Sequence, residues 1–215
     1  MSVSSSAREA AKGQEASRPT LVLASQSRTR VALLRQAGIC CAAERAGIDE
    51  EEIKRALRRE NATAGQAAET LAELKASKVS RGHPGALVVG ADQILECEGE
   101  WLAKPADLDQ ARAQLSALRG KAHELATAAV VARDGGRIWH HVARARLHMR
   151  AFSDAFLDSY LANIGRAACE SVGAYQLEGL GVQLFSRVEG DYFAILGLPL
   201  LPLLDFLRHH GVAPV

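Results

Sequence analysis

The 215-residue sequence has almost no net charge, because 26 lysine and arginine residues balance 25 aspartate and glutamate residues and leave a formal charge of +1. A chain of this kind has no broad electrostatic field to attract a nucleic-acid backbone or an anionic membrane. We therefore expect no nucleic-acid partner. Any anionic ligand must be bound by a local cluster of side chains.

Long apolar segments are also missing. The apolar stretch 194–204 is interrupted by glycine and proline and falls well short of the roughly 20 residues that cross a bilayer. Residues 1–19 are rich in serine, alanine and charged residues, and they lack the apolar core of a secretory signal. The sequence predicts no membrane partner, a disordered extension over residues 1–19 and one domain over residues 20–215.

Cysteine is scarce and histidine is scattered. The four cysteines form no C-x-x-C pair, and adjacent residues such as Cys40 and Cys41 rarely form a disulfide. We expect reduced thiols in a cytoplasmic protein. No histidine has a second histidine or a cysteine at the usual zinc-ligand spacing, so a zinc site is not expected, and His123 and His148 are interpreted as structural residues of strands.

Strand-like and helix-like segments are interspersed along the chain. Strands are predicted for residues 20–24, 86–91, 123–133, 137–149, 182–188 and 192–196. Helices are predicted after Ser27 and Ser153, between Asp107 and Gly120, and over residues 64–81 and 201–208. Because several strands are joined by hairpins and only one by a helical crossover, the class is α/β with a mixed sheet and long antiparallel hairpins.

The segment 21–30 is the first candidate binding element. A strand that ends in small hydroxyl residues and enters a helix directs unpaired backbone N–H groups and the positive end of the helix dipole at one point, which favours phosphate. Ser25 and Ser27 add hydroxyl donors, and Arg30 can return a guanidinium to the same place. Taken alone, the segment is better explained as an ordinary helix cap with solvated arginines, and it gains weight only from other polar groups near the same cleft.

Four further polar groups are expected near the same cleft, namely Asp92, Lys104, Glu178 and Glu50. Asp92 follows the buried strand 86–91, where it either binds Mg²⁺ and activates water or caps the next turn. Lys75 and Lys104 supply compact positive charges for phosphate oxygens, although most lysines are simply solvated. Glu50 lies in an acidic run that begins a helix or completes an oxygen-ligand set for a metal, and spacing alone does not decide between these.

Ordered short motifs from Leu21 to Gly211 resemble those of the Maf family of nucleoside triphosphate pyrophosphatases, once called septum formation inhibitors. The matching pieces are Leu-Ala-Ser25-Gln-Ser27 with Arg30, Gly47-Ile-Asp49-Glu50, Leu71-Ala-x-x-Lys75-Ala, Gly90-Ala-Asp92, Lys104-Pro105, Gly173-Ala-Tyr-x-x-Glu-Gly179, Glu189-Gly-Asp-Tyr192 and Gly197-Leu-Pro199-Leu200.

The resemblance implies a two-lobed α/β fold around a central cleft, similar to inosine triphosphate pyrophosphatases, and a homodimer. It implies cleavage of nucleotides to monophosphate and pyrophosphate with a divalent cation, Mg²⁺ or Mn²⁺, as part of nucleotide-pool house-cleaning. Asp92 matches the catalytic acid-base position, and Glu50 an acidic residue of the metal region. The residues implied to face the triphosphate are Ser25, Arg30, Lys75 and Lys104, and we add Ser27 to this group.

Three positions that track substrate choice in the family are occupied by Thr29, Gln93 and Glu178. Members that prefer dTTP and UTP typically have Arg, Thr and Gln there, whereas Gln93 and Glu178 resemble the branch that acts on 7-methyl-GTP. A carboxylate at Glu178 can accept hydrogen bonds from guanine N1–H and the exocyclic amino group. Thr29 matches neither branch, and Arg28 and Thr29 replace the Pro and first Arg of the usual signature.

We therefore predict a pyrophosphatase for a guanine-type nucleotide. The alternatives are a dTTP or UTP pyrophosphatase, a non-specific phosphatase, and a regulator of cell division that binds a nucleotide without hydrolysing it.

Overall fold

The structure is a computed structural model that describes residues 20–214, so the expected extension 1–19 lies outside the described residues. In the described part, seven strands form one mixed sheet in the order β2-β1-β3-β5-β6-β7, with β4 paired to β3. The strands are β1 (Leu21–Leu23), β2 (Ala42–Ala43), β3 (Leu87–Cys97), β4 (Glu100–Leu102), β5 (Ala122–Arg133), β6 (Gly136–Met149) and β7 (Phe185–Glu189). The α/β class with a mixed sheet is confirmed.

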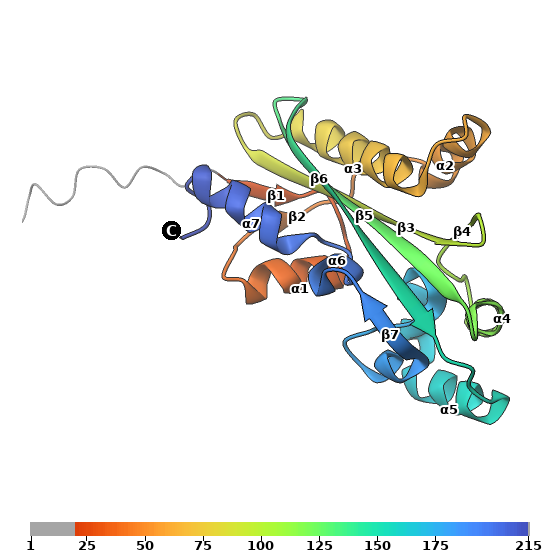
Figure 1. The fold of residues 1–215 in the computed structure, drawn as a ribbon. Coiled ribbons are helices and arrows are strands. Elements are labelled where there is room, and N and C mark those ends of the chain that lie inside the picture. The colour runs from red at the N-terminus through yellow and green to blue at the C-terminus, as the bar shows by residue number, and fades with distance from the viewer. Residues whose placement is uncertain (1–19, 215) are drawn as a thin grey trace, which may run out of the picture.

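Three long strands form the axis of the molecule. β3 pairs antiparallel with β5, and β5 pairs antiparallel with β6, whereas β1 runs parallel to both β2 and β3. The β5–β6 hairpin turns at Asp134 and Gly135, both at positive φ, as the Asp-Gly-Gly sequence predicts. The long antiparallel hairpins are thus confirmed, and they extend from one end of the molecule to the other (Figure 1).

Seven α-helices pack around the sheet within residues 20–214. They are α1 (Arg28–Gln36), α2 (Glu50–Arg59), α3 (Ala64–Ser80), α4 (Leu108–Leu118), α5 (Asp154–Ile164), α6 (Tyr192–Ile195) and α7 (Leu200–His209). Figure 1 shows α2 and α3 on one side of the long strands, and α1, α6 and α7 on the other. The helix starts expected at Asp107 and Ser153 are confirmed, since each side chain accepts a hydrogen bond from a backbone N–H three residues on.

The helix α3 lies unusually close to β3. A side chain added at Gly90 would place its Cβ 2.1 Å from the Ala72 carbonyl oxygen, so only glycine fits at this crossing. Alanines of α3 and β5 form the interface, and their small side chains allow the close approach. As a result, polar side chains on this face of α3 come within reach of β3.

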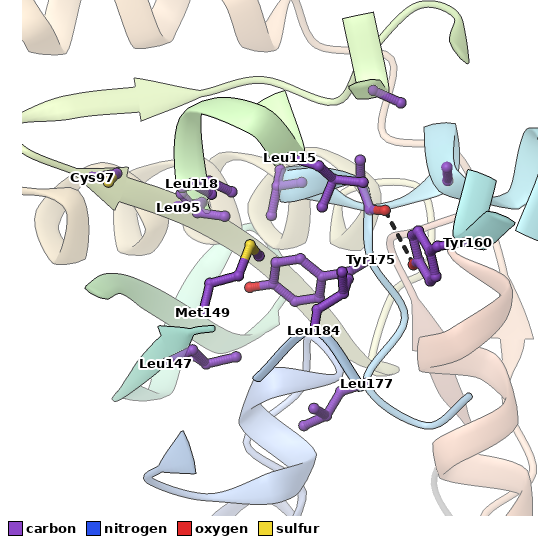
Figure 2. Packing of buried hydrophobic residues seen from close by; sticks show 14 of the residues in the cluster. Leu95, Cys97, Leu115, Leu118, Leu147, Met149, Tyr160, Tyr175, Leu177 and Leu184 are labelled. Atoms are coloured by element: carbon purple, nitrogen blue, oxygen red, sulfur yellow. Dashed lines mark hydrogen bonds between the residues drawn. The ribbon is translucent and has the colours of Figure 1, made fainter. Parts of the chain in front are cut away.

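Besides the cluster at the α3–β3 crossing, a second apolar cluster lies at the opposite end of the long strands. It joins Leu95 and Leu147 of the sheet to Leu115 of α4, Leu157 of α5 and Tyr175. Figure 2 shows the Tyr175 ring among apolar side chains, and the dashed line joins the Tyr160 hydroxyl to the Ala174 carbonyl oxygen. This end also includes the 3₁₀ turns Gly165–Glu170, Val172–Ala174 and Leu180–Leu184.

Three local expectations were wrong in whole or in part. The strand 86–91 does not end before Asp92, because β5 continues to pair with β3 as far as Glu96, and Asp92 therefore lies mid-strand. The segment 192–196 is not a strand but begins as the short helix α6, whose Ala194 N–H is capped by the Asp191 carboxylate. In addition, the strand expected over 182–188 begins only at Phe185, after a 3₁₀ turn.

No helix within residues 20–214 combines the length and apolarity that crossing a membrane requires.

Candidate active site

A cleft of about 700 Å³ opens between the two ends of the molecule. Its walls come from the β1–α1 turn, the start of α2, α3, β3, the segment after β4, the loop 170–178 and the segment 195–197. All ten site residues predicted from the sequence line it, namely Ser25, Ser27, Thr29, Arg30, Glu50, Lys75, Asp92, Gln93, Lys104 and Glu178. Their roles remain predictions, but their convergence is a structural fact.

The β1–α1 turn is both a helix cap and a wall of the cleft. Ser27 is the N-cap of α1 and accepts a hydrogen bond of 3.4 Å from the Arg30 N–H, while the Ser27 N–H donates to Ser25 Oγ at 3.2 Å. The cap interpretation is thus correct for Ser27. It does not exclude a binding role, because both serines also line the cleft.

Arg30 is held firmly by backbone oxygens. Its Nε donates to the Gly197 carbonyl at 2.7 Å, and one terminal nitrogen donates to the Ala91 carbonyl at 2.8 Å and to Ser25 Oγ at 3.3 Å. Burial lowers the pKa of its guanidinium, partly offset by the charges of two nearby carboxylates. The second terminal nitrogen has no hydrogen-bond partner within residues 20–214 and is available to an anion in the cleft.

Lys75 of α3 bridges two carboxylates on the floor of the cleft. Its Nζ lies 2.5 Å from Asp92 Oδ1 and 2.8 Å from Glu50 Oε1. Both Lys75 and Asp92 are almost fully buried, at 6% and 4% exposure. A buried charge is tolerated only when it is paired, so this ion pair explains how the apolar sheet accommodates a carboxylate.

Glu50 joins this group from the first turn of α2. The helix cap is Asp49, whose carboxylate accepts from the Glu52 N–H. Burial acts to raise the pKa of Glu50, but the positive charge and hydrogen bond of Lys75, with help from Lys54, lower it overall. Glu50 therefore lies in the acidic start of the helix, which is one of the two roles expected from the sequence. It also faces Lys75 in the cleft, where the second expected role, as a metal ligand, would place it.

The two carboxylates fit a hard divalent cation. Asp92 Oδ2 is buried and has no hydrogen-bond partner in the described part of the chain, which leaves an acceptor oxygen unsatisfied at the base of the cleft. Within residues 20–214 no three His, Cys, Asp or Glu side chains gather as a complete metal site. A cation here would therefore need oxygens from phosphate and water besides Asp92 and Glu50, as Mg²⁺ sites commonly have.

Lys104 completes a group of three cations. It lies between β4 and α4, and its pKa is lowered by burial among the cleft atoms and by repulsion from Arg30. Repulsion of this kind is relieved when an anion binds between the positive groups. Arg30, Lys75 and Lys104 can therefore contact a polyphosphate in the cleft, with the two carboxylates beside Lys75.

The opposite wall is a loop anchored in the second apolar cluster. Tyr175 is buried, and its hydroxyl shares a hydrogen bond of 2.8 Å with His123 Nε2. Burial raises the pKa of Tyr175 and lowers that of His123 to about 4. His123 is thus a structural histidine, as expected. It fixes the base of the loop that carries Glu178 into the cleft.

Thr127 is a polar residue beside the cleft that the sequence did not single out. Thr127 of β5 is 1% exposed and contacts Gln93 across the strand pair. The available signal was a hydroxyl side chain within the run Leu-Ala-Thr-Ala-Ala-Val, which is otherwise typical of a fully buried strand. A buried hydroxyl in such a run requires a polar partner.

The comparisons with known proteins identify the family to which the chain is similar. The family model described as "Maf-like protein" matches residues 20–210. A protein of Paramagnetospirillum magneticum named nucleoside triphosphate pyrophosphatase is 57% identical over 190 residues, covering 88% of this chain and 98% of its own length. The protein of the same name from Granulibacter bethesdensis is 53% identical and covers 91% of this chain and 99% of its own length.

A third relative carries a narrower name. The 7-methyl-GTP pyrophosphatase of Brucella abortus is 48% identical over 188 residues, covering 87% of this chain and 94% of its own length. The family model and all three relatives extend over most of the chain, and the family model includes every residue that lines the cleft from Ala24 onward. The chain belongs to the Maf-like protein family.

Proposed function

We propose that this protein is a hydrolase that cleaves a nucleoside triphosphate to the monophosphate and pyrophosphate in the cleft described above. The observation that carries the proposal is the buried Asp92–Lys75 pair, with Glu50 bonded to Lys75 and with Arg30 and Lys104 in the same cleft. This arrangement combines a water-activating carboxylate, oxygen ligands for a metal and positive charge for a leaving group. The names of the relatives support the same activity.

Asp92 is the proposed catalytic residue. Its Oδ1 is held by Lys75, so Oδ2 is the oxygen that can orient a water molecule or accept its proton as the water attacks the α-phosphorus. A Mg²⁺ or Mn²⁺ ion held by Asp92, Glu50 and phosphate oxygens would supply charge neutralisation at the phosphates. We propose a divalent cation as the cofactor on the basis of these oxygen ligands.

The three cations are proposed to hold the triphosphate. Arg30 offers its free terminal nitrogen, and Lys75 and Lys104 offer ammonium groups, while Ser25 and Ser27 contribute hydroxyl contacts at the start of α1. Phosphoryl transfer needs positioning and fixed positive charge rather than a covalent nucleophile. No covalent intermediate is required in this scheme.

We propose a guanine-type base, modified or not, as the preferred substrate. Glu178 is exposed in the cleft, where its carboxylate can accept from guanine N1–H and the 2-amino group. A positively charged 7-methylated guanine would gain additional attraction to the carboxylate. Thr29, in the first turn of α1, also lines the cleft but carries no charge to discriminate between bases.

The experiment is incubation of the purified chain with canonical and methylated nucleoside triphosphates and Mg²⁺ or Mn²⁺. Pyrophosphate as the first product, with the monophosphate in equal amount, supports the proposal. Orthophosphate as the first product would identify a non-specific phosphatase. Nucleotide binding without hydrolysis, whichever metal ion is added, would instead support the alternative of a non-catalytic regulator. A preference for dTTP and UTP would reject the proposed guanine-type substrate.

We further propose a cytoplasmic homodimer with a house-cleaning role in the nucleotide pool. Its four cysteines are free, which is consistent with a reducing compartment. The dimer rests on the family resemblance, and light scattering of the purified protein tests it directly.

A further inference from the structure

The side-chain amide of Gln93 is surrounded by hydrogen-bond acceptors. Its Nε2 lies 2.8 Å from Thr127 Oγ1, 3.0 Å from the Ala194 carbonyl oxygen and 3.1 Å from the Ile195 carbonyl oxygen. Gln93 and Thr127 are direct cross-strand partners on β3 and β5, and both carbonyls belong to α6. Three separate segments thus meet at one nitrogen.

The Thr127 hydroxyl adds a third hydrogen-bond partner at the amide nitrogen. Its oxygen lies 2.9 Å from the Ala194 carbonyl, which can only accept, so the hydroxyl hydrogen is donated there. The hydroxyl oxygen is then left to accept from Gln93. If the amide were flipped, its oxygen would face the Ala194 and Ile195 carbonyl oxygens with no hydrogen between them, so these two carbonyls exclude the flipped orientation.

The opposite end of the amide is therefore an oxygen that faces the cleft. Gln93 lines the cleft, and its Oε1 has no hydrogen-bond partner within residues 20–214 yet is not a buried atom. A free glutamine side chain can present either a donor or an acceptor to a ligand. Gln93 presents only an acceptor, because both N–H hydrogens are used by the protein.

We propose that Thr127 is a positioning residue for base recognition, because with the two carbonyls of α6 it holds Gln93 so that only the amide oxygen meets the base. This inference rests on the proposed nucleotide-hydrolysing function. Thr127 is buried and does not line the cleft, so it acts through Gln93 and not by touching the substrate.

The fixed orientation selects a base by its pairing edge. Gln93 and Glu178 together present two acceptors to the cleft. Guanine has adjacent donors at N1 and the 2-amino group, whereas uracil and thymine have a single N3–H donor between two carbonyl acceptors. Uracil or thymine therefore brings a carbonyl oxygen towards at least one of the two protein oxygens. Two acceptors then face each other, and neither has a hydrogen-bond donor.

The test compares Thr127→Val, which removes the hydroxyl with little change in volume, with Thr127→Ser, which retains it. The kcat/KM values for GTP and UTP are measured by pyrophosphate release, and circular dichroism checks folding. Binding of the α,β-methylene analogues of GTP and UTP, which resist cleavage at the α-phosphorus, is measured in parallel. In Thr127→Val we expect the GTP preference to fall about five-fold, mainly through the KM for GTP, with kcat for UTP unchanged. Thr127→Ser should restore the preference.

A second variant keeps the inference testable if Thr127→Val does not fold. Gln93→Glu retains an acceptor towards the base but has no N–H group for the three acceptors around the amide nitrogen. Its preference for GTP over UTP should therefore fall by at least as much as that of Thr127→Val. The inference is overturned if either variant keeps the wild-type preference for GTP over UTP, or if Thr127→Val loses kcat/KM equally for both nucleotides. It is also overturned if Thr127→Ser does not show the wild-type preference, or if the wild-type protein has no GTP preference.

The two proposals fail in different ways. If the wild-type protein releases no pyrophosphate from any nucleotide, the hydrolase function is wrong. Binding of the uncleavable analogues to the same variants still decides the role of Thr127.

Discussion

Lys75 Nζ and Asp92 Oδ1 are 2.5 Å apart at the bottom of the cleft, in a buried ion pair that joins α3 to the middle of β3. The pair forms because Gly90 allows α3 to approach the strand closely. It leaves Asp92 Oδ2 as a buried acceptor without a partner in the described part of the chain. The same contact thus fixes the position of the carboxylate and leaves one of its oxygens for a ligand.

Asp92→Asn should fold normally and lose pyrophosphate release by about 100-fold or more, the range for removal of a general base. The amide keeps the shape of the carboxylate and a carbonyl oxygen for Lys75, but it accepts protons poorly. Steady-state pyrophosphate release is the measurement. Asp109→Asn, at an exposed position of α4, is the matched control and should retain full activity. Wild-type-like turnover in Asp92→Asn would remove this residue from the chemistry.

Glu50→Gln should raise the Mg²⁺ concentration needed for half-maximal activity by about ten-fold, because ligand charge sets the affinity for a hard cation. Metal titrations at saturating nucleotide measure the effect. Glu52→Gln provides the control, since Glu52 is exposed on the same first turn of α2 but does not line the cleft. An identical metal requirement in both variants would show that Glu50 is not a ligand.

Stability should decrease as the pH falls from 6.5 to 4, owing to His123. The unfolded chain binds a proton at this imidazole near its ordinary pKa of 6.5, whereas burial and the nearby His148 lower the folded pKa to about 4. Between these values the unfolded state binds more protons, so the free energy of unfolding falls, by up to about 3 kcal/mol in total. Urea unfolding at several pH values measures this loss.

His123→Gln is the comparison variant for that experiment, because glutamine does not titrate and can still bond to the Tyr175 hydroxyl. Its unfolding free energy should depend less on pH across the same window. An equally steep loss in the variant would assign the acid sensitivity to other groups.

Gly197→Ala should impair catalysis as well as stability. Gly197 has φ +103, which disfavours any side chain, and an added Cβ would lie 3.3 Å from Arg30 Nε. We expect a loss of about 1–2 kcal/mol in unfolding free energy and a higher KM as Arg30 is displaced. Gly211→Ala is the control, because Gly211 has φ +71 but open space around it. If both variants lose stability and neither changes KM, Gly197 does not position Arg30.

Local hydrogen bonding made much of the fold predictable. The helix starts at Ser27, Asp107 and Ser153 depend on a side chain that bonds to a backbone N–H three residues away. The β5–β6 hairpin depends on adjacent turn residues. Asp92 was expected at the end of a strand, but pairing with β5 extends β3 beyond it. The segment 192–196 was expected to be a strand, but the Asp191 cap starts a helix there.

By itself, the sequence determined the α/β class, the long hairpins and a set of polar residues that all reach one cleft, because periodicity, turn residues and ordered motifs are local features of the chain. Tertiary structure alone decided how those residues interact. Lys75 meets Asp92 through a helix–strand crossing, and Arg30 bonds to a carbonyl 167 residues away. The orientation of the Gln93 amide likewise depends on three segments meeting at one atom, which no single stretch of sequence specifies.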